Sequence, residues 1–484
     1  MTTTLTDSSP LGSIETRSID YVPSHERSGR LTDQATIWFA GSAHLLSMAT
    51  GAIGIWAGLN LGWTLVALAL GALIGTIPVS VHATQGPHLG LPQLVQSRPQ
   101  FGRYGALAIW LMALIVYWGY VVFGGNMLGA TAEQLGAGSA PIWAIITGLV
   151  AVLLAIYGYH WLHAVQRWIT VALIVVLIIY TGGLAMNGAI PASAWDLSAG
   201  TFQVAPFFIQ VSAAAAYQLS WAFFVSDYSR YMPANTNKGK IITWTSLGLF
   251  FGVFSFMAIG AVGAALLPDE YVVTALAQTA DSVFVGLGPI MLVIGGAGLL
   301  GLMAMCVYGG SLTIITAMDS IKSVLPTRKV RIWTILLVGL TSTYAGAFMP
   351  ADYLNTSFWT ILVVLSYLMA PWTAINLTDF FLVRRGHYSI REMFSRTGIY
   401  GNWNMRGILS YLVTFAIMIP FMILPFYTGP IATALGGVDI AFFIGIPLGG
   451  VIYWVMCLNM DMKAERAIVD KADANLDSIA KPIS

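Results

Sequence analysis

The chain has 484 residues, of which 57% are hydrophobic and only 9% are charged, and its mean hydropathy is +0.76. This composition indicates an integral membrane protein with many spans and excludes an ordinary water-soluble domain. The formal net charge of +1 gives no reason to expect a nucleic-acid partner. Cys306 and Cys457 lie on separate apolar segments, so no disulfide framework is expected.

Apolar segments divide the chain into roughly twelve expected spans, since about 20 residues cross the hydrocarbon core of a bilayer. We therefore predict an all-α polytopic membrane protein. The expected spans are residues 34–59, 63–82, 104–134, 141–159, 165–186, 205–231, 241–267, 283–311 (continuing to 319), 332–349, 357–383, 408–427 and 440–458.

The basic residues predict the orientation of the chain. All 22 lysines and arginines fall in the two tails or in the connections that follow even-numbered spans. Cytoplasmic loops carry an excess of such residues, so we expect both termini in the cytoplasm and the protein in the cell (inner or plasma) membrane. The expected parts are an N-terminal tail at 1–33, a transmembrane transporter domain at 34–460 and a C-terminal tail at 461–484. The N-terminal tail carries no evident signal peptide and is expected to be mostly disordered.

A polar cluster interrupts the apolar segment 213–233, which reads AAAAYQLSWAFFVSDYSRYMP. The cluster consists of Tyr217, Gln218, Ser220 and Trp221. Hydrogen-bonding groups at membrane depth are costly unless they face protein, water or a ligand, so this helix is expected to line a cavity. A polar contact between packed helices is the alternative. Asp227 and Arg230 follow three residues apart and are expected to form a gating or structural ion pair.

The first span is expected to be an interrupted helix. Gly51 and Gly54 lie three residues apart next to Thr50, and glycine weakens a helix interior. Transporters use such breaks because freed backbone groups can coordinate a substrate or an ion. A small-residue packing face explains the same glycines equally well. His44 is a candidate proton carrier because its reference pKa lies near physiological pH, although such a histidine is more often simply hydrogen-bonded.

Three separated motifs carry a family resemblance. The loop at 85–102 contains the pattern G-P-x-x-G-L-x-Q-x-x-x-S-R-x-x-F-G. This pattern resembles the loop after the second helix in the purine-cytosine permease branch of the nucleobase:cation symporter-1 family. Segments 220–233 and 371–388 resemble the signatures of its sixth and tenth helices. The resemblance covers residues 15–458 and implies a five-plus-five inverted repeat, named for the bacterial leucine transporter, with two additional C-terminal helices.

The resemblance also implies a substrate site between the first, third, sixth and eighth helices. In the family, a Trp of the third helix and residues of the sixth sandwich a planar ring, and Trp118 and Trp221 are the matching residues. Gln218 and Ser220 suit the polar edge of the ring, and the backbone near Gly51 is a further candidate contact.

The eighth span departs from the family pattern. Cys306 stands where the family usually has an Asn that binds the ring. A thiol is a weak donor that cannot read two groups on a nucleobase. Either another side chain, such as Gln218 or Asn126, makes the polar contact, or the ligand is not a standard nucleobase.

The coupling ion is expected to be H⁺ or Na⁺, and no other cofactor is expected. Sodium-driven members of the family place hydroxyls around the eighth helix, a role that only Ser311 and Thr313, with Thr50 of the first span, can fill here. We favour the proton, with His44 as a candidate carrier, in part because relatives of this branch are proton symporters. In the tenth span, Pro371 loosens the helix, and Tyr367 lies in the region that gates the substrate in the family.

The expected function is a secondary active symporter that imports a nucleobase (cytosine or a purine) or a related heterocycle. A vitamin-precursor pyrimidine or pyridine is the first alternative substrate, and a hydantoin or allantoin is the second. A passive facilitator or channel for a neutral solute, and an intramembrane receptor, are alternatives of a different class. No metal-ligand cluster, phosphate loop or nucleophile elbow indicates an enzyme. The expected partners are the heterocycle and the lipid bilayer, and the oligomeric state is left open.

Overall fold

The computed structural model describes residues 17–157 and 159–479, without the side chains of 159–163, 165, 351–359 and 478–479. Eight of the described helices are long and apolar enough to cross a membrane, and shorter apolar helices complete the set of roughly twelve expected spans. The spans are α1 (Leu31–Ser42) with α2 (Leu45–Gly51) and α3 (Ile53–Trp56), α4 (Leu61–His82), α7 (Ala106–Gln134), α8 (Ala140–Tyr157), α9 (Tyr159–Met186), α10 (Val204–Leu219) with the 3₁₀ turn η5 (Ser220–Phe223) and α11 (Val225–Ser229), α12 (Lys238–Leu266), α14 (Leu287–Ile321), α15 (Arg328–Phe348), α16 (Ala351–Thr378) with the π-helical turn η6 (Asp379–Val383), α18 (Met405–Met418) and α20 (Ala441–Met456).

Short elements connect the spans. They are η1 (Ser24–Glu26), α5 (Gln85–Leu89), η2 (Val95–Ser97), α6 (Arg98–Phe101), η3 (Ala192–Trp195), η4 (Ala199–Thr201), α13 (Val272–Asp281), α17 (Ile390–Phe394), η7 (Ile419–Phe421), β1 (Ile423–Leu424), β2 (Tyr427–Thr428), α19 (Pro430–Ala434), α21 (Met462–Asp473) and α22 (Leu476–Ile479). The two strands form an antiparallel pair in which Ile423 lies opposite Thr428. The eleventh span therefore ends earlier than its expected limit of residue 427, because the chain turns into this hairpin.

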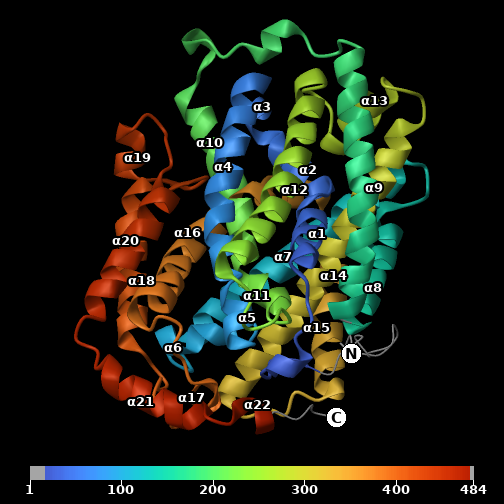
Figure 1. The fold of residues 1–484 in the computed structure, drawn as a ribbon. Helices are drawn as coiled ribbons and strands as arrows, with labels where there is room; N and C mark the ends of the chain where they lie inside the picture. The colour runs from blue at the N-terminus through green and yellow to red at the C-terminus, as the bar shows by residue number, and fades with distance from the viewer. Residues whose placement is uncertain (1–16, 158, 480–484) are drawn as a thin grey trace.

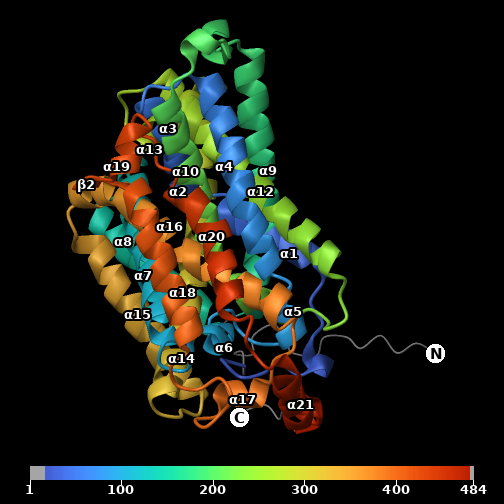
Figure 2. The same cartoon turned by 90° about the vertical axis from the view of Figure 1, so that its left-hand side faces the viewer.

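The spans pack as two groups with a C-terminal layer beside them (Figures 1 and 2). In the first group α1 and α10 pack on α12 and α4, and in the second α7 and α8 pack on α14 and α15. α16 and α18 pack on α20 outside these groups. Glycines allow the closest crossings, because a Cβ on Gly71 would meet the Val211 carbonyl and one on Gly248 would meet the Ala35 carbonyl.

The first span is interrupted, but its main break lies before the glycine pair. α1 ends at Ser42, and His44 has an extended backbone (φ −161°, ψ 173°) before α2 begins. Near the glycines only a turn at Ala52 separates α2 from α3. A Cβ on Gly51 would clash with the Met257 carbonyl of α12, so Gly51 serves the close packing of α2 and α12.

Both ends of the described chain pack at one end of the molecule, which we call the tail end. There the segment 17–30 is not the disordered lead-in that was expected, because Ile19, Val22 and Arg27 are buried. Arg27 donates to the Pro87 carbonyl, which lies in α5. Helices α17, α21 and α22 lie at the same end, and α3 and α13 lie at the opposite end (Figure 1). Residues 1–16, to which the expectation of disorder also applied, lie outside the described residues.

Candidate functional site: an aromatic box between two broken helices

The break in the first span lies next to the sixth span in the middle of the molecule. His44 forms the N-cap of α2, and its Nε2 lies 2.7 Å from the Tyr217 hydroxyl on α10. Three residues later α10 gives way to the 3₁₀ turn η5, which begins at Ser220. Two interrupted helices thus meet where backbone groups are released from regular helical bonds.

Four buried aromatic side chains, which we call the aromatic box, surround this meeting point: Trp38, Tyr120, Tyr217 and Trp221. The rings of Tyr120 and Trp221 are almost parallel, at 11°, and their centroids are 6.4 Å apart. Tyr217 meets Tyr120 edge-on at 6.0 Å and Trp221 edge-on at 6.4 Å. Trp38 contacts Trp221 edge-on from α1 at 5.5 Å. Aromatic carbons in contact lie about 3.5 Å apart, so two rings with a third between them have centroids about 7 Å apart, slightly more than the Tyr120–Trp221 separation.

The polar atoms of the box are only partly satisfied. The Tyr120 hydroxyl and Ser220 Oγ are 2.9 Å apart, and Ser220 donates to the Tyr217 carbonyl over 2.7 Å. Trp221 Nε1 and, at the last residue of α1, Ser42 Oγ are buried without a hydrogen-bond partner in the described part of the chain. Buried polar atoms are normally paired, so these two atoms are available to a ligand or to water.

The expected substrate residues do not all face the box. Ser220 and Trp221 belong to the box, and the Cys306 thiol of α14 is buried within electrostatic range of the Tyr120 hydroxyl. Gln218 turns towards α4, where it donates to Thr76 over 2.7 Å. Trp118 is half-buried and packs against the core two residues before Tyr120, about 200° around α7.

The contact of Trp118 with a substrate stays a prediction, and the residue of α7 that aligns with Trp221 is Tyr120. Gly51 faces α12 rather than the box. Tyr120 had no role in the site expected from the sequence. The spacing of Tyr117 and Tyr120, one helical turn apart, was a signal that both face the same way.

The expected coupling residues do not meet at the break. Thr50 donates to the Leu46 carbonyl within its own helix, and Thr313 donates likewise to the Gly309 carbonyl. Ser311 faces α15, with its Oγ 2.7 Å from Thr334 Oγ1. The residue of α14 that faces the break is Gly298, on which a Cβ would lie 2.5 Å from the Ala43 carbonyl and 3.3 Å from the His44 Cβ. Glycine supplies no side-chain oxygen there for a metal cation.

Apart from Ser220 and Trp221, which lie at the box, the three sequence motifs meet at the tail end. His82 stacks on Trp372 with ring centroids 5.1 Å apart, and Trp372 donates to Ser97 over 3.0 Å. The backbone amide of Gln93 donates to Asp227 over 2.9 Å. The loop after α4 is therefore tied both to α16 and to α11.

Arg230 also lies at the tail end and is buried. It donates to the Ser18 carbonyl over 2.6 Å, to Tyr231 over 3.0 Å and to Tyr308 over 3.3 Å. Its expected ion pair with Asp227 stays a prediction.

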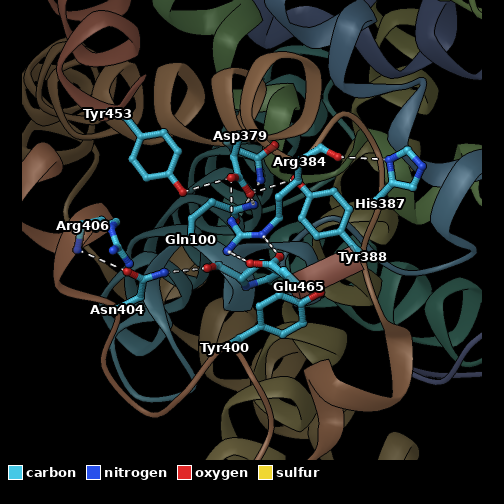
Figure 3. Close-up of polar contacts among 12 residues, drawn as sticks. Gln100, Asp379, Arg384, His387, Tyr388, Tyr400, Asn404, Arg406, Tyr453 and Glu465 are labelled. Atoms are coloured by element: carbon cyan, nitrogen blue, oxygen red, sulfur yellow. Dashed lines mark hydrogen bonds and ion pairs between the residues drawn. The ribbon is translucent and has the colours of Figure 1, made fainter. Parts of the chain in front are cut away.

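A buried carboxylate organises the tail-end terminus of α16 (Figure 3). Asp379 accepts hydrogen bonds from Gln100 at 2.7 Å, Tyr388 at 2.8 Å and Tyr453 at 3.0 Å. It also forms an ion pair with Arg384 at 2.6 Å. These partners come from α6, the segment after η6 and α20. Asp379 and Arg384 lie in the segment 371–388 that resembles a family signature, but neither was assigned a role. The signal available in the sequence was an acidic residue after a long apolar run.

A cavity of about 450 Å³ opens at the opposite end, between α2, α3, α7 and α13. Its lining includes Ile53, Trp56, Phe123, Asn126 and Tyr271. Asn126, a candidate polar contact for the substrate, therefore lies in this cavity, about 9 Å along α7 from Tyr120. At this end Tyr367 bonds Asp439 and the Ile423 carbonyl, which ties α16 to the β hairpin.

Two spans broken side by side in the middle of the molecule, with an aromatic box between them, are the arrangement typical of secondary transporters. The chain belongs to the family of permeases for cytosine/purines, uracil, thiamine and allantoin, whose model matches residues 21–445. The family that its motifs resembled is thereby confirmed.

Individual relatives agree with this assignment. The chain is 34% identical to YxlA of Bacillus subtilis (strain 168), whose name places it among the purine-cytosine permeases, over 92% of this chain and 96% of that protein. It is 26% identical to the purine-cytosine permease FCY2 of Saccharomyces cerevisiae over 91% and 85% of the two chains. It is 24% identical to the hydantoin permease of Microbacterium maritypicum over 85% of each.

Solved structures confirm the fold. Mhp1, a nucleobase-cation-symport-1 family transporter, matches in its closed conformation with bromovinylhydantoin bound, with a TM-score of 0.74 at 18% identity over 96% of this chain and 100% of that one. The inward-facing conformation of Mhp1 matches with a TM-score of 0.69 at 19% identity over 98% and 100%. The expected five-plus-five inverted repeat with two further C-terminal helices is therefore correct.

Proposed function

We propose that this protein imports a nucleobase, cytosine or a purine, together with a proton, and that the base binds between the rings of Tyr120 and Trp221. The near-parallel alignment of these two rings is the observation that carries the proposal. Stacking on aromatic side chains contributes about 1–3 kcal/mol per base in proteins that bind nucleobases in this way. Purine-cytosine permeases among the relatives support this substrate class.

The polar edge of the base is read by groups around the box. Trp221 Nε1 is a donor without a partner, and the Ser220 and Tyr120 hydroxyls form an adaptable pair that can donate or accept. Cys306 adds a small thiol where the family usually has an Asn. This site reads fewer groups on the base than an amide would, which suits a transporter that accepts more than one base.

The proposed orientation places the tail end in the cytoplasm. The tails and the connections at this end carry the basic residues, as cytoplasmic segments of membrane proteins do. The cavity at the opposite end then faces outward, and the ties of the loop after α4 to α11 and α16 close the inward path.

The proton is favoured over sodium because glycine faces the break in the first span. Gly298 offers no side-chain oxygen as a ligand, and Ser311 and Thr313 are bonded elsewhere. Sodium binding sites require several oxygen ligands, whereas a proton requires one basic atom.

A hydantoin is the second candidate substrate. The hydantoin permease among the relatives and the ligand in the Mhp1 structure favour it. In addition, Cys306 stands where the family usually has an Asn, so the amide that would recognise a nucleobase is missing. A vitamin-precursor pyrimidine or pyridine is favoured by Cys306 alone.

Uptake by cells that lack nucleobase transport tests the proposal. Radiolabelled cytosine, adenine and hydantoin are offered to a deficient bacterial strain that expresses the chain, with and without a protonophore. Saturable uptake of cytosine or adenine that the protonophore abolishes is the expected result. Uptake of hydantoin alone would transfer the proposal to the second substrate, and uptake that no ion gradient affects would indicate a passive facilitator instead.

A further inference from the structure

We infer that the hydrogen bond between His44 and Tyr217 couples proton binding to substrate binding. His44 takes up the proton, and Tyr217 changes what it offers to the substrate. This inference rests on the proposed function, and it assigns the coupling to two named side chains of the same site.

The first step is the position of His44. Its side chain is fully buried at the point where α1 ends and α2 begins. Nε2 lies 2.7 Å from the Tyr217 hydroxyl, whereas Nδ1 has no hydrogen-bond partner of ordinary geometry in the described part of the chain. The Gly41 carbonyl, at the last turn of α1, is a backbone acceptor that interacts with the ring. A second proton on the imidazole therefore has an acceptor in reach.

The second step is the surroundings of this pair. Tyr217 faces His44 from α10, Gly298 faces it from α14, and Tyr120 and Cys306 adjoin the Tyr217 ring from α7 and α14. No charged side chain among the described residues is recorded in contact with His44. The buried carboxylates, such as Asp227, Asp319 and Asp379, bind partners at the tail end. Among the described side chains at the box, His44 is thus the one that can take up a proton as a base.

The third step is the polarity of the hydrogen bond. A neutral His44 that carries its proton on Nδ1 accepts at Nε2, so the Tyr217 hydroxyl donates to it. A protonated imidazole donates from both nitrogens, so Nε2–H donates to the Tyr217 oxygen. The hydroxyl proton of Tyr217 is then released to donate to another acceptor.

The fourth step is what receives that proton. The Tyr217 ring meets both Tyr120 and Trp221 edge-on, so it borders the space that the proposed base shares with them. Ring nitrogens and carbonyl oxygens of nucleobases are acceptors. The protonated state of His44 therefore adds one donor to the site and binds the base more tightly, and by linkage the bound base favours protonation of His44.

Transport then carries one proton with each base. The proton enters from the outer solution onto His44, and it leaves to the cytoplasm after the base has dissociated. No covalent bond is formed or broken, and the imidazole returns to its neutral form at the end of each cycle.

Equilibrium binding of radiolabelled cytosine and adenine to the purified full-length protein tests the inference. Affinity is measured from about pH 5.5 to about pH 8, on either side of the ordinary histidine pKa. The wild-type protein is expected to bind about ten-fold more tightly at the lower pH, the size of one additional hydrogen bond to a buried site. His44→Gln and Tyr217→Phe are each expected to bind the base with less than about two-fold dependence on pH.

Proteoliposomes provide the second measurement. Both variants are expected to lose the accumulation of base that a pH gradient drives. His25→Gln is the matched control, because the His25 side chain is exposed at the tail end. It is expected to behave as the wild-type protein does.

Retention of both pH-dependent affinity and gradient-driven accumulation by His44→Gln would overturn the inference. If that variant is not monodisperse, Tyr217→Phe decides in the same way, since it removes only one hydroxyl. Failure of the wild-type protein to bind any of cytosine, adenine and hydantoin would instead overturn the proposed function, and the coupling with it.

Discussion

Arg384 and Asp379 form an ion pair of 2.6 Å from which water is almost completely excluded. The carboxylate also accepts hydrogen bonds from Tyr388 and Tyr453, so each of its two oxygens has a hydroxyl donor. The arginine continues outward to Glu465 of α21 over 2.6 Å. One buried pair therefore connects the end of α16 with the C-terminal segment.

Removal of both partners is expected to cost less than the two single removals added together. Arg384→Gln or Asp379→Asn leaves an uncompensated buried group and should lower the free energy of unfolding by about 3–5 kcal/mol. The double variant should cost less than the sum of the two single variants. Thermal unfolding of the purified protein measures this. Arg385→Gln is the control, since Arg385 is exposed, and additive single effects would contradict the account.

The C-terminal helix α22 is expected to hold the N-terminal segment through Asp477. Its carboxylate accepts hydrogen bonds from Tyr21 at 2.7 Å and from Ser24 Oγ at 2.6 Å. Burial alone would raise the pKa of Asp477, but these hydrogen bonds outweigh it and hold the pKa below its ordinary value. A lowered carboxyl pKa stabilises the contact above the pKa of the unfolded chain, and this stabilisation is lost as pH falls through the lowered value.

Limited proteolysis of the N-terminal segment measures this contact. Asp477→Asn should speed cleavage near Arg27 at neutral pH, where the wild-type carboxylate is ionised. Asp470→Asn, a change at an exposed position of α21, should leave the rate unchanged. Equal cleavage rates for the Asp477 variant and the wild-type protein would show that other contacts hold the segment.

Gly51 is expected to matter for packing more than for the substrate. Gly51→Ala places a Cβ against the Met257 carbonyl and should destabilise the fold by about 1–3 kcal/mol. Gly119→Ala, where nothing lies within 4 Å of the new Cβ, should instead stabilise α7 by about 0.5–1 kcal/mol. Thermal unfolding and cytosine affinity are compared for both. If the Gly51 variant had normal stability but bound cytosine weakly, Gly51 would be a substrate contact instead.

Hydropathy and motif spacing were sufficient for the topology but not for the rotation of each helix. The roughly twelve spans follow from segment length, and three long motifs identified the family. Trp118 and Tyr120 lie in one apolar run. At about 100° per residue, they lie about 200° apart around α7. No amphipathic pattern in this run marks the inward face, because one side meets lipid and the other meets protein of similar polarity. The choice of Trp118 therefore rested on the family resemblance and not on a pattern that marks the inward face.

The breaks illustrate the same limit. Glycine was the sequence signal for a weak helix, but the first span opens at His44, whose side chain pairs with Tyr217 far along the chain. Gln218 likewise faces α4 because its neighbour Tyr217 faces the box. Such orientations are set by contacts between distant segments, and a single sequence carries no record of them.

The affinity of Tyr120→Ala and Trp118→Ala for radiolabelled cytosine tests the central claim most directly. Loss of one stacking face should cost about 1–3 kcal/mol, which is about 5- to 150-fold in affinity. The account predicts a loss of this size for Tyr120→Ala and for Trp221→Ala, and less than about two-fold for Trp118→Ala. A large loss for Trp118→Ala with normal binding by Tyr120→Ala would contradict it.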